Sequence, residues 1–434
     1  MTRPMPLACA WAVLLLAGAA LAGPVEDRAA FNTNLVRPGI ELEEPLADPP
    51  ADSGVVKATY DTELGPMNAY ATPVREDGRR RPALIWVEGG FGGIGAWTVD
   101  PDNAERENDQ TVTAYLQAGG NGDKLVVFAP TFRGTSGNPG RYEMFLGEAD
   151  DLVAAVAHVA ARPDVDPRQI YVGGHSTGGT VALLSAALTD KVAGVLSVGG
   201  APDIVSVTRQ GGYGYEPFDT GDLAESRMRS PATYAAAVNV PVLYVEGRDD
   251  DVSVENYPSA ARRMAAGVRG EQMKVAIVPG HNHFTVLRPL HELTARLLAS
   301  DAPRLPTPEE VLAAYPPARD DPEGLQLIAQ CASALQRGLY QRQPLTMSPA
   351  AVARLKELAG EAEPAIPPAD AVVFLDFWMS GEGLLWDVSV LDHTPAGCVV
   401  TEASGLTVAI PRDAAGAFVD TKVVFDDEDG FELE

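Results

Sequence analysis

The sequence predicts an α/β fold with a mostly parallel, doubly wound sheet and a small C-terminal α+β appendage. Between Val55 and Ser300, nearly continuous apolar runs alternate with segments whose apolar residues recur at helical spacing. Strands of this kind are typical of a parallel sheet that is buried on both faces. After a Pro-rich break at Pro303–Pro317, apolar residues alternate with period two and no helix intervenes, which predicts an antiparallel sheet.

The individual elements follow from these patterns. Six runs predict the parallel strands: Ala83–Val87, Lys124–Pro130, Gln169–Gly174, Val192–Gly200, Pro241–Gly247 and Met273–Gly280. Helices are predicted between them at Asp150–Pro163, Thr180–Asp190 and Ser259–Gly267. Ahead of the sheet, Val55–Val74 predicts an antiparallel pair that turns at Leu64-Gly65-Pro66. In the appendage we expect helices at Glu323–Arg337 and Ala350–Gly360, and strands at 371–379, 384–392, 405–411 and 418–425.

The 434 residues divide into five predicted parts: a signal peptide (1–22), a leader or linker (23–54), the α/β domain (55–300), a Pro-rich linker (301–322) and the α+β C-terminal domain (323–434). Hydrophobic residues make up 46% of the chain and charged residues 21%, which excludes wholesale disorder.

The N-terminus predicts export. Arg3 precedes an apolar stretch, Leu7–Leu21, and Ala20-Leu21-Ala22 forms a small-residue cleavage site, which together indicate a secretory signal peptide. An uncleaved membrane anchor is the alternative, but the stretch is shorter than the roughly 20 residues that a membrane span needs. We therefore expect a periplasmic or secreted protein without stable membrane insertion. In an oxidising compartment, Cys331 and Cys398 could form a disulfide.

The charge disfavours several classes of partner. The formal net charge is −27, and it becomes −28 when Arg3 is lost with the signal peptide. Such a surface repels phosphate backbones, so we expect no nucleic-acid partner.

The cysteines lack metal-ligand spacing, so no metal is predicted. The sequence does not indicate an oligomeric state.

A nucleophile motif joins a predicted strand to a predicted helix. Gly174-His175-Ser176-Thr177-Gly178-Gly179 follows the strand Gln169–Gly174 and opens the next helix. In a G-x-S-x-G turn between a strand and a helix, the serine occupies a strained backbone conformation that exposes its hydroxyl. The helix N-terminus behind it favours a developing oxyanion. This context predicts that Ser176 is a catalytic nucleophile.

Two later strands are followed by the partners that such a serine needs, a base and a carboxylate. The strand Pro241–Gly247 precedes three adjacent aspartates, 249–251, of which one can orient a histidine. The strand Met273–Gly280 precedes His281 and His283. Because the carboxyl ends of parallel strands meet at one sheet edge, we expect these groups to lie near Ser176.

With these residues, Val55–Leu298 resembles the α/β-hydrolase fold, and within it the catalytic domain of the prolyl oligopeptidase family and its dienelactone-hydrolase-like relatives. The similarity lies in EGGFGG, PTFRGTSG, the segment Asp150–Gly179, the segment Ser230–Val252, and VPGHNHF. The resemblance implies Ser176 as nucleophile, Asp250 as the acid after Gly247, and His283 as the base, with His281 as the alternative. The β-propeller of that family is missing, so we expect that no propeller gates access to the site.

The loop that begins at Glu88 is predicted to complete the site. Backbone N–H groups of Thr177 and of Gly90 or Phe91 are expected to form the oxyanion hole. Relatives carry Tyr or His at the position of Glu88, and an ionised glutamate cannot donate a hydrogen bond. Glu88 therefore either binds a cationic group of the substrate, such as a free amine, or is the buried partner of Arg133.

The same loop contains a dinucleotide-like motif, Gly90-Phe91-Gly92-Gly93-Ile94-Gly95, directly after a strand. That fingerprint also needs a helix at its end and an acidic residue after the next strand, and neither pattern follows here. We therefore expect no nucleotide and no other cofactor.

Together these features predict an exported serine hydrolase that cleaves an ester, amide or peptide bond through an acyl-enzyme, most like a prolyl oligopeptidase-type peptidase. Its partner would be a small-molecule or peptide substrate. One alternative is a carboxylesterase acting on small esters. The other is a non-catalytic secreted binding protein that uses a hydrolase scaffold.

Overall fold

The structure is a computed structural model of the chain. It describes residues 23–37, 45–91, 94, 96–100, 112–120, 122–209, 211–214, 216–248, 257–315, 345–361, 365–367, 369–380, 383–392, 394, 398–411, 422–426 and 430–433. The predicted signal peptide, the helix predicted at Glu323–Arg337 and Cys331 lie outside the described residues. Within this part of the chain, no helix has both the length and the apolar character needed to cross a membrane.

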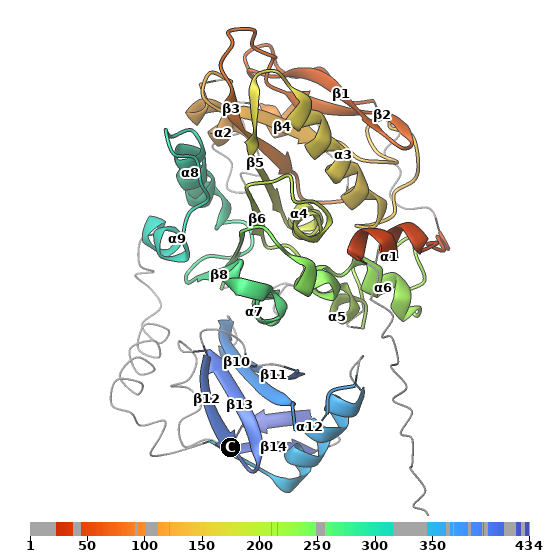
Figure 1. Cartoon of the computed structure of the whole chain (residues 1–434), viewed down its shortest axis with the longest axis vertical. Helices are drawn as coiled ribbons and strands as arrows, with labels where there is room; N and C mark the ends of the chain where they lie inside the picture. The colour runs from red at the N-terminus through yellow and green to blue at the C-terminus, as the bar shows by residue number, and fades with distance from the viewer. Residues whose placement is uncertain are drawn as a thin grey trace, which may run out of the picture.

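The larger unit is built on an eight-stranded sheet with the order β1-β2-β4-β3-β5-β6-β7-β8 (Figure 1). Strands β3 to β8 pair in parallel, and β2 pairs antiparallel with both β1 and β4. The α/β fold, its six parallel strands and the antiparallel pair ahead of them are therefore confirmed. The strands are β1 Val56–Thr62, β2 Gly65–Ala71, β3 Arg81–Val87, β4 Val126–Pro130, β5 Val165–His175, β6 Gly194–Val198, β7 Val242–Gly247 and β8 Met273–Val278.

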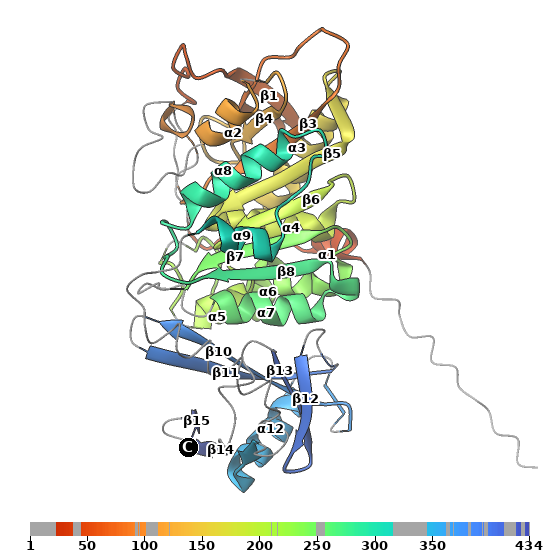
Figure 2. The same ribbon diagram turned by 90° about the vertical axis from the view of Figure 1, so that its left-hand side faces the viewer.

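Helices cover both faces of this sheet (Figures 1 and 2). On one face, α3 (Gly147–Ala161), α4 (Thr177–Leu188) and α7 (Tyr257–Gly267) enclose a core that includes Val156 and Leu183. On the other face, α2 (Thr113–Ala118), α8 (Leu287–Leu298) and α9 (Pro308–Ala314) enclose a second core that includes Leu116 and Leu290. The strands are apolar on both sides because each side contacts a core. The chain between β6 and β7 forms α5 (Ile204–Arg209), α6 (Leu223–Arg229) and a 3₁₀ helix (Pro231–Ala237), and shorter 3₁₀ helices lie at Ala96–Val99 and Arg269–Glu271.

Parts of the two predicted linkers pack against this unit. The leader begins with a helix, α1 (Pro24–Ala30), whose buried Arg28 donates hydrogen bonds to the carbonyls of Leu146 and Met228. Helix α9 starts in the Pro-rich segment with a capping box between Thr307 and Glu310 and buries Val311 completely. Composition alone suggested linkers, but a few buried side chains attach both segments to the larger unit.

The appendage contains two small sheets, so the expectation of one antiparallel sheet is wrong. One has the order β11-β10-β13-β12, in which β10 and β13 pair in parallel, and the other has the order β15-β14-β9. Period-two alternation determines which face of a strand is buried, but it does not determine which strand pairs with which. The elements are β9 Thr346–Met347, α12 Pro349–Glu361, β10 Val372–Ser380, β11 Gly383–Leu391, β12 Cys398–Ala403, β13 Leu406–Pro411, β14 Lys422–Asp426 and β15 Gly430–Leu433.

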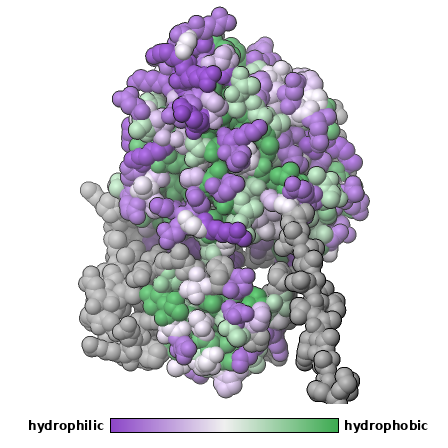
Figure 3. Space-filling view, in the orientation of Figure 1, coloured by the Kyte–Doolittle hydropathy of each residue, from purple (hydrophilic) through white to green (hydrophobic). Residues whose placement is uncertain are grey.

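The surface of the larger unit is mainly hydrophilic on the face shown in Figure 3, with apolar residues scattered among polar ones. This agrees with a chain that carries 60 acidic and 33 basic residues. Most of the large apolar side chains of this unit are therefore buried in its two cores.

Candidate active site

Ser176 occupies a sharp turn between β5 and α4. Its backbone has φ 53° and ψ −119°, a conformation that costs a non-glycine residue about 1–3 kcal/mol. The Ser176 N–H donates to the carbonyl of Val198 at the end of β6 (2.8 Å). A Cβ on Gly178 would overlap the carbonyl oxygen of Val87, so only glycine permits this close approach of α4 to β3. The predicted strand–turn–helix geometry around Ser176 is confirmed.

The loop after β3 passes directly over this turn. A Cβ on Gly89 would lie 3.2 Å from the Cβ of Ser176. The Thr177 hydroxyl donates to the Gly90 carbonyl (2.6 Å), and Gly90 has φ 85°. The structure thus brings Gly90, Phe91 and Thr177, the predicted oxyanion residues, to one side of Ser176. Their role in stabilising an oxyanion stays a prediction.

His283 lies in the loop after β8 and is paired with a buried carboxylate. Its Nδ1 is 3.2 Å from Oε2 of Glu246, and the two side chains are 8% and 1% exposed. A Cβ on Gly199, which follows β6, would overlap the His283 ring. Because the Ser176 N–H is bonded to Val198, Ser176 and His283 border the same short segment of chain.

Glu246 is the site residue that sequence reasoning missed. It is the penultimate residue of β7, in a strand whose other residues are apolar or glycine, and was counted as part of that strand. A carboxylate in a fully buried strand needs a partner, and that signal could have identified it. Asp250, the predicted acid, lies outside the described residues. The alternative base, His281, contacts the ring of Tyr315 (4.7 Å between centroids) rather than Glu246.

His175 supports the position of His283. Its Nε2–H donates to the carbonyl of His283 (3.1 Å), and the two rings lie 4.6 Å apart. Burial and the neighbouring His283 lower the pKa of His175 well below its usual value. His175 is therefore neutral at physiological pH. Its hydrogen bond fixes the His283 backbone without placing a positive charge beside the His283 ring.

A cavity opens beside the predicted oxyanion residues. The cavity is partly open to solvent, and Gly90, Phe91 and Thr177 belong to its lining. Most of its other walls are apolar, as with Phe132 and Phe145. An acyl group whose carbonyl is held at Ser176 would therefore have an apolar space next to it.

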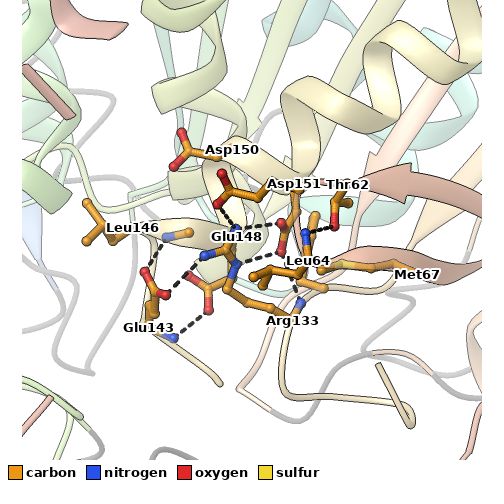
Figure 4. A network of polar contacts seen from close by, with 12 residues as sticks. Thr62, Leu64, Met67, Arg133, Glu143, Leu146, Glu148, Asp150 and Asp151 are labelled. Carbon is orange, nitrogen blue, oxygen red and sulfur yellow. Dashed lines mark hydrogen bonds and ion pairs between the residues drawn. The ribbon is translucent and has the colours of Figure 1, made fainter. Parts of the chain in front are cut away.

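Glu88, which also lines this cavity, accepts hydrogen bonds from the indole N–H of Trp86 and the backbone N–H of Gly89 (3.3 Å each). The expected alternative, a buried pair with Arg133, is wrong. Arg133 instead binds Asp151 in a bidentate manner (2.8 and 3.0 Å) and Glu143 (3.0 Å), as Figure 4 shows. The carboxylate of Asp151, which lies on α3, occupies the Arg133 guanidinium instead.

Glu148 is a second carboxylate in the cavity lining. The pKa of Glu148 is raised to about 7, mainly by burial and also by the nearby Asp151 and Glu143, while a hydrogen bond from the Glu143 N–H (2.7 Å) acts in the opposite direction. Its other neighbours with titratable groups include Arg133, Arg229 and Tyr142. The carboxyl group is therefore close to half-ionised at neutral pH.

This pKa predicts a pH-dependent stability. The unfolded chain releases the Glu148 proton near the usual value of 4.5, whereas the folded protein keeps it until about 7, so ionisation favours unfolding as pH rises between these values. Above pH 7 the destabilisation is constant at about 3 kcal/mol. We expect Glu148→Gln to be more stable than wild type in urea unfolding at pH 8, with a gain about 2 kcal/mol larger than at pH 5. The exposed Glu76→Gln serves as control, and an equal gain at both pH values would contradict the assignment.

Comparison with known proteins agrees with this geometry. Residues 122–298 match the prolyl oligopeptidase family. The matched segment contains Ser176, Glu246 and His283. It supports a hydrolase of the serine peptidase or esterase type and confirms the resemblance to α/β-hydrolases.

The chain matches only part of the length of each similar protein. An uncharacterised protein of Mycobacterium tuberculosis is 29% identical over 175 residues, which is 40% of this chain and 59% of that protein. The uncharacterised peptidase YtmA of Bacillus subtilis is 29% identical over 144 residues, 30% of this chain and 55% of that protein. Among solved structures, the acylaminoacyl peptidase of Pyrococcus horikoshii is 14% identical with a TM-score of 0.46, covering 59% of this chain and 44% of that one. The chain thus spans less than two thirds of each.

Proposed function

We propose that the protein is a serine hydrolase that cleaves an ester, amide or peptide bond through an acyl-enzyme. One observation carries the proposal: the strained Ser176 lies at the same sheet edge as a buried His283–Glu246 pair. The strained turn exposes the serine hydroxyl, and a histidine oriented by a carboxylate is the general base that activates such a nucleophile.

In the proposed mechanism, the Ser176 Oγ attacks the carbonyl carbon of the substrate while His283 accepts the hydroxyl proton at Nε2. Glu246, hydrogen-bonded to Nδ1, orients the ring so that Nε2 is the proton acceptor, and it stabilises the imidazolium that forms. Asp250 is retained as a second candidate for this orienting role. Backbone N–H groups of Thr177 and of Gly90 or Phe91 would bind the tetrahedral oxyanion. The leaving group then takes the proton from His283, and water releases the acyl group by the reverse sequence of proton transfers.

The family match is compatible with either a peptidase or an esterase, and a carboxylesterase is the second candidate. The uncharacterised relative YtmA is described as a peptidase, which favours amide substrates. We further propose that the chain is exported by the signal peptide at 1–22, because its charged, apolar and small-residue regions follow the required order.

Fluorophosphonate labelling tests the proposed function. A fluorophosphonate probe reacts with an activated serine hydroxyl, so we expect wild type to be labelled and Ser176→Ala to remain unlabelled. Ser185→Ala is a matched control, since Ser185 lies on α4 and donates only to the Ala182 carbonyl of its own helix. The proposal fails if wild type is not labelled, or if Ser176→Ala is labelled as strongly as wild type.

A further inference from the structure

The cavity beside Ser176 carries negative charge that an uncharged acyl group would not require. Its lining includes two carboxylates, Glu88 and Glu148, within walls that are otherwise largely apolar. An apolar cavity with one or two polar groups is typical of a site that selects its ligand by an apolar body and a placed polar end.

One carboxylate oxygen of Glu148 accepts no hydrogen bond from the described residues. Its Oε1 accepts the backbone N–H of Glu143 (2.7 Å), whereas its Oε2 has no hydrogen-bond partner among the described residues. The residue is only 3% exposed. A buried carboxylate oxygen without a donor is costly, and a native protein retains such a group where it serves a purpose.

The neighbouring cation does not supply the missing donor. Arg133 directs its N–H groups at Asp151 and Glu143 and interacts with Glu148 only through space (Figure 4). With Glu63, whose Oε1 lies 3.6 Å from Nη2 of Arg133, four carboxylates thus surround one guanidinium. The excess negative charge on this wall of the cavity favours a cationic ligand group over a neutral or anionic one.

We propose that this cavity binds an ammonium group on the acyl part of the substrate, with the carboxylate of Glu148 as its partner. The inference rests on the proposed function, and it deepens that function by naming the substrate class: amides or esters of amino-bearing acyl groups. The apolar walls, with Phe132, Phe145 and Val181, would contact the carbon chain that carries the nitrogen.

The geometry favours an ammonium over a guanidinium. A guanidinium binds a carboxylate best through two parallel hydrogen bonds and therefore needs both oxygens. Oε1 of Glu148 is already occupied by the Glu143 N–H, so one oxygen remains for one donor. A compact ammonium, with rotatable donors on a flexible chain, fits that requirement.

Two pairs of substrates test this in turnover and separate the two sources of an ammonium. N-acetyl-lysine p-nitroanilide against N-acetyl-norleucine p-nitroanilide reports a side-chain ammonium, and leucine p-nitroanilide against N-acetyl-leucine p-nitroanilide reports an α-ammonium. In at least one pair we expect the cationic member to have a kcat/KM at least tenfold higher in wild type. Glu148→Gln should reduce that ratio to near one, whereas the exposed Glu76→Gln should preserve it.

A binding measurement keeps this inference separable from the catalytic proposal. In the Ser176→Ala background, calorimetric titration compares N-acetyl-lysine amide with N-acetyl-norleucine amide, and leucine amide with N-acetyl-leucine amide. If the cationic member binds more tightly and this preference is lost in Ser176→Ala/Glu148→Gln, the ammonium site is supported. This holds even if wild type shows no turnover, in which case only the proposed catalysis fails. Equal binding of both members in each pair, preference for the neutral member, or a preference that survives Glu148→Gln would overturn the inference. Circular dichroism of each variant checks that it is folded.

Discussion

Replacing Ser176 by alanine is expected to lower kcat by about 10⁴-fold or more on every substrate the protein cleaves. The change removes the only oxygen that can form the acyl-enzyme at this turn, while the Cβ and the strained backbone at φ 53° are retained. A panel of p-nitrophenyl esters and aminoacyl-p-nitroanilides, run with wild type and Ser176→Ala side by side, measures the effect. The panel also separates esterase from peptidase activity.

The control for this result is Ser185→Ala, which removes a buried hydroxyl nine residues further along the same segment of chain. We expect it to retain activity close to that of wild type, and thermal unfolding of both variants checks that neither has lost the fold. Ser176→Ala with activity near that of wild type would contradict the nucleophile assignment and would favour a non-catalytic role for the scaffold.

The second large effect is expected at Glu246. Changing Glu246 to glutamine removes the negative charge next to Nδ1 of His283, and we expect kcat to fall by about 10²- to 10⁴-fold. A carboxylate beside the imidazole favours its protonated form, so its loss should also move the acid limb of the pH profile of kcat/KM to lower pH. A merely structural role would not produce that shift.

Asp250→Asn is the matched comparison, because the family resemblance implies Asp250 as the acid. If Glu246 orients His283, the shift of the acid limb accompanies Glu246→Gln. If only Asp250→Asn lowers kcat and shifts the limb, while Glu246→Gln leaves both unchanged, the orienting role of Glu246 is contradicted. The double variant shows whether the two carboxylates act together, since their effects then fail to add.

The order of the elements in the larger unit could be read from local pattern. Each of the six parallel strands has a continuous apolar run, and the helix α4 follows the G-x-S-x-G motif as expected. These features are local, since burial on both faces requires apolar residues at successive positions. The pairing of strands in the appendage was not predictable in this way, because β10 and β13 are joined by contacts between segments far apart in the chain.

In the candidate site, too, some residues could be predicted from local sequence pattern and others only from the folded structure. The spacing of the glycines and the serine predicts the turn, and the position of His283 after a strand predicts that it lies at the site. Glu246 is a single acidic residue in an apolar strand, and only its 3.2 Å separation from His283 makes it a candidate for the orienting role. Likewise, nothing local distinguishes Glu148 from the other acids near the start of α3, including Asp150 and Asp151.

By itself, the sequence determined the α/β fold, the strand–turn–helix at Ser176 and the resemblance to prolyl oligopeptidase-type hydrolases, because each depends on residues close together in the chain. Only the tertiary structure decided that Glu246 faces His283, that Arg133 binds Asp151 rather than Glu88, and that Glu148 keeps an unpartnered oxygen in the cavity lining. The physical reason is that an acidic side chain is ambiguous in sequence. Its role depends on burial and on the partner that folding brings to it, and folding brought these partners from other strands and loops.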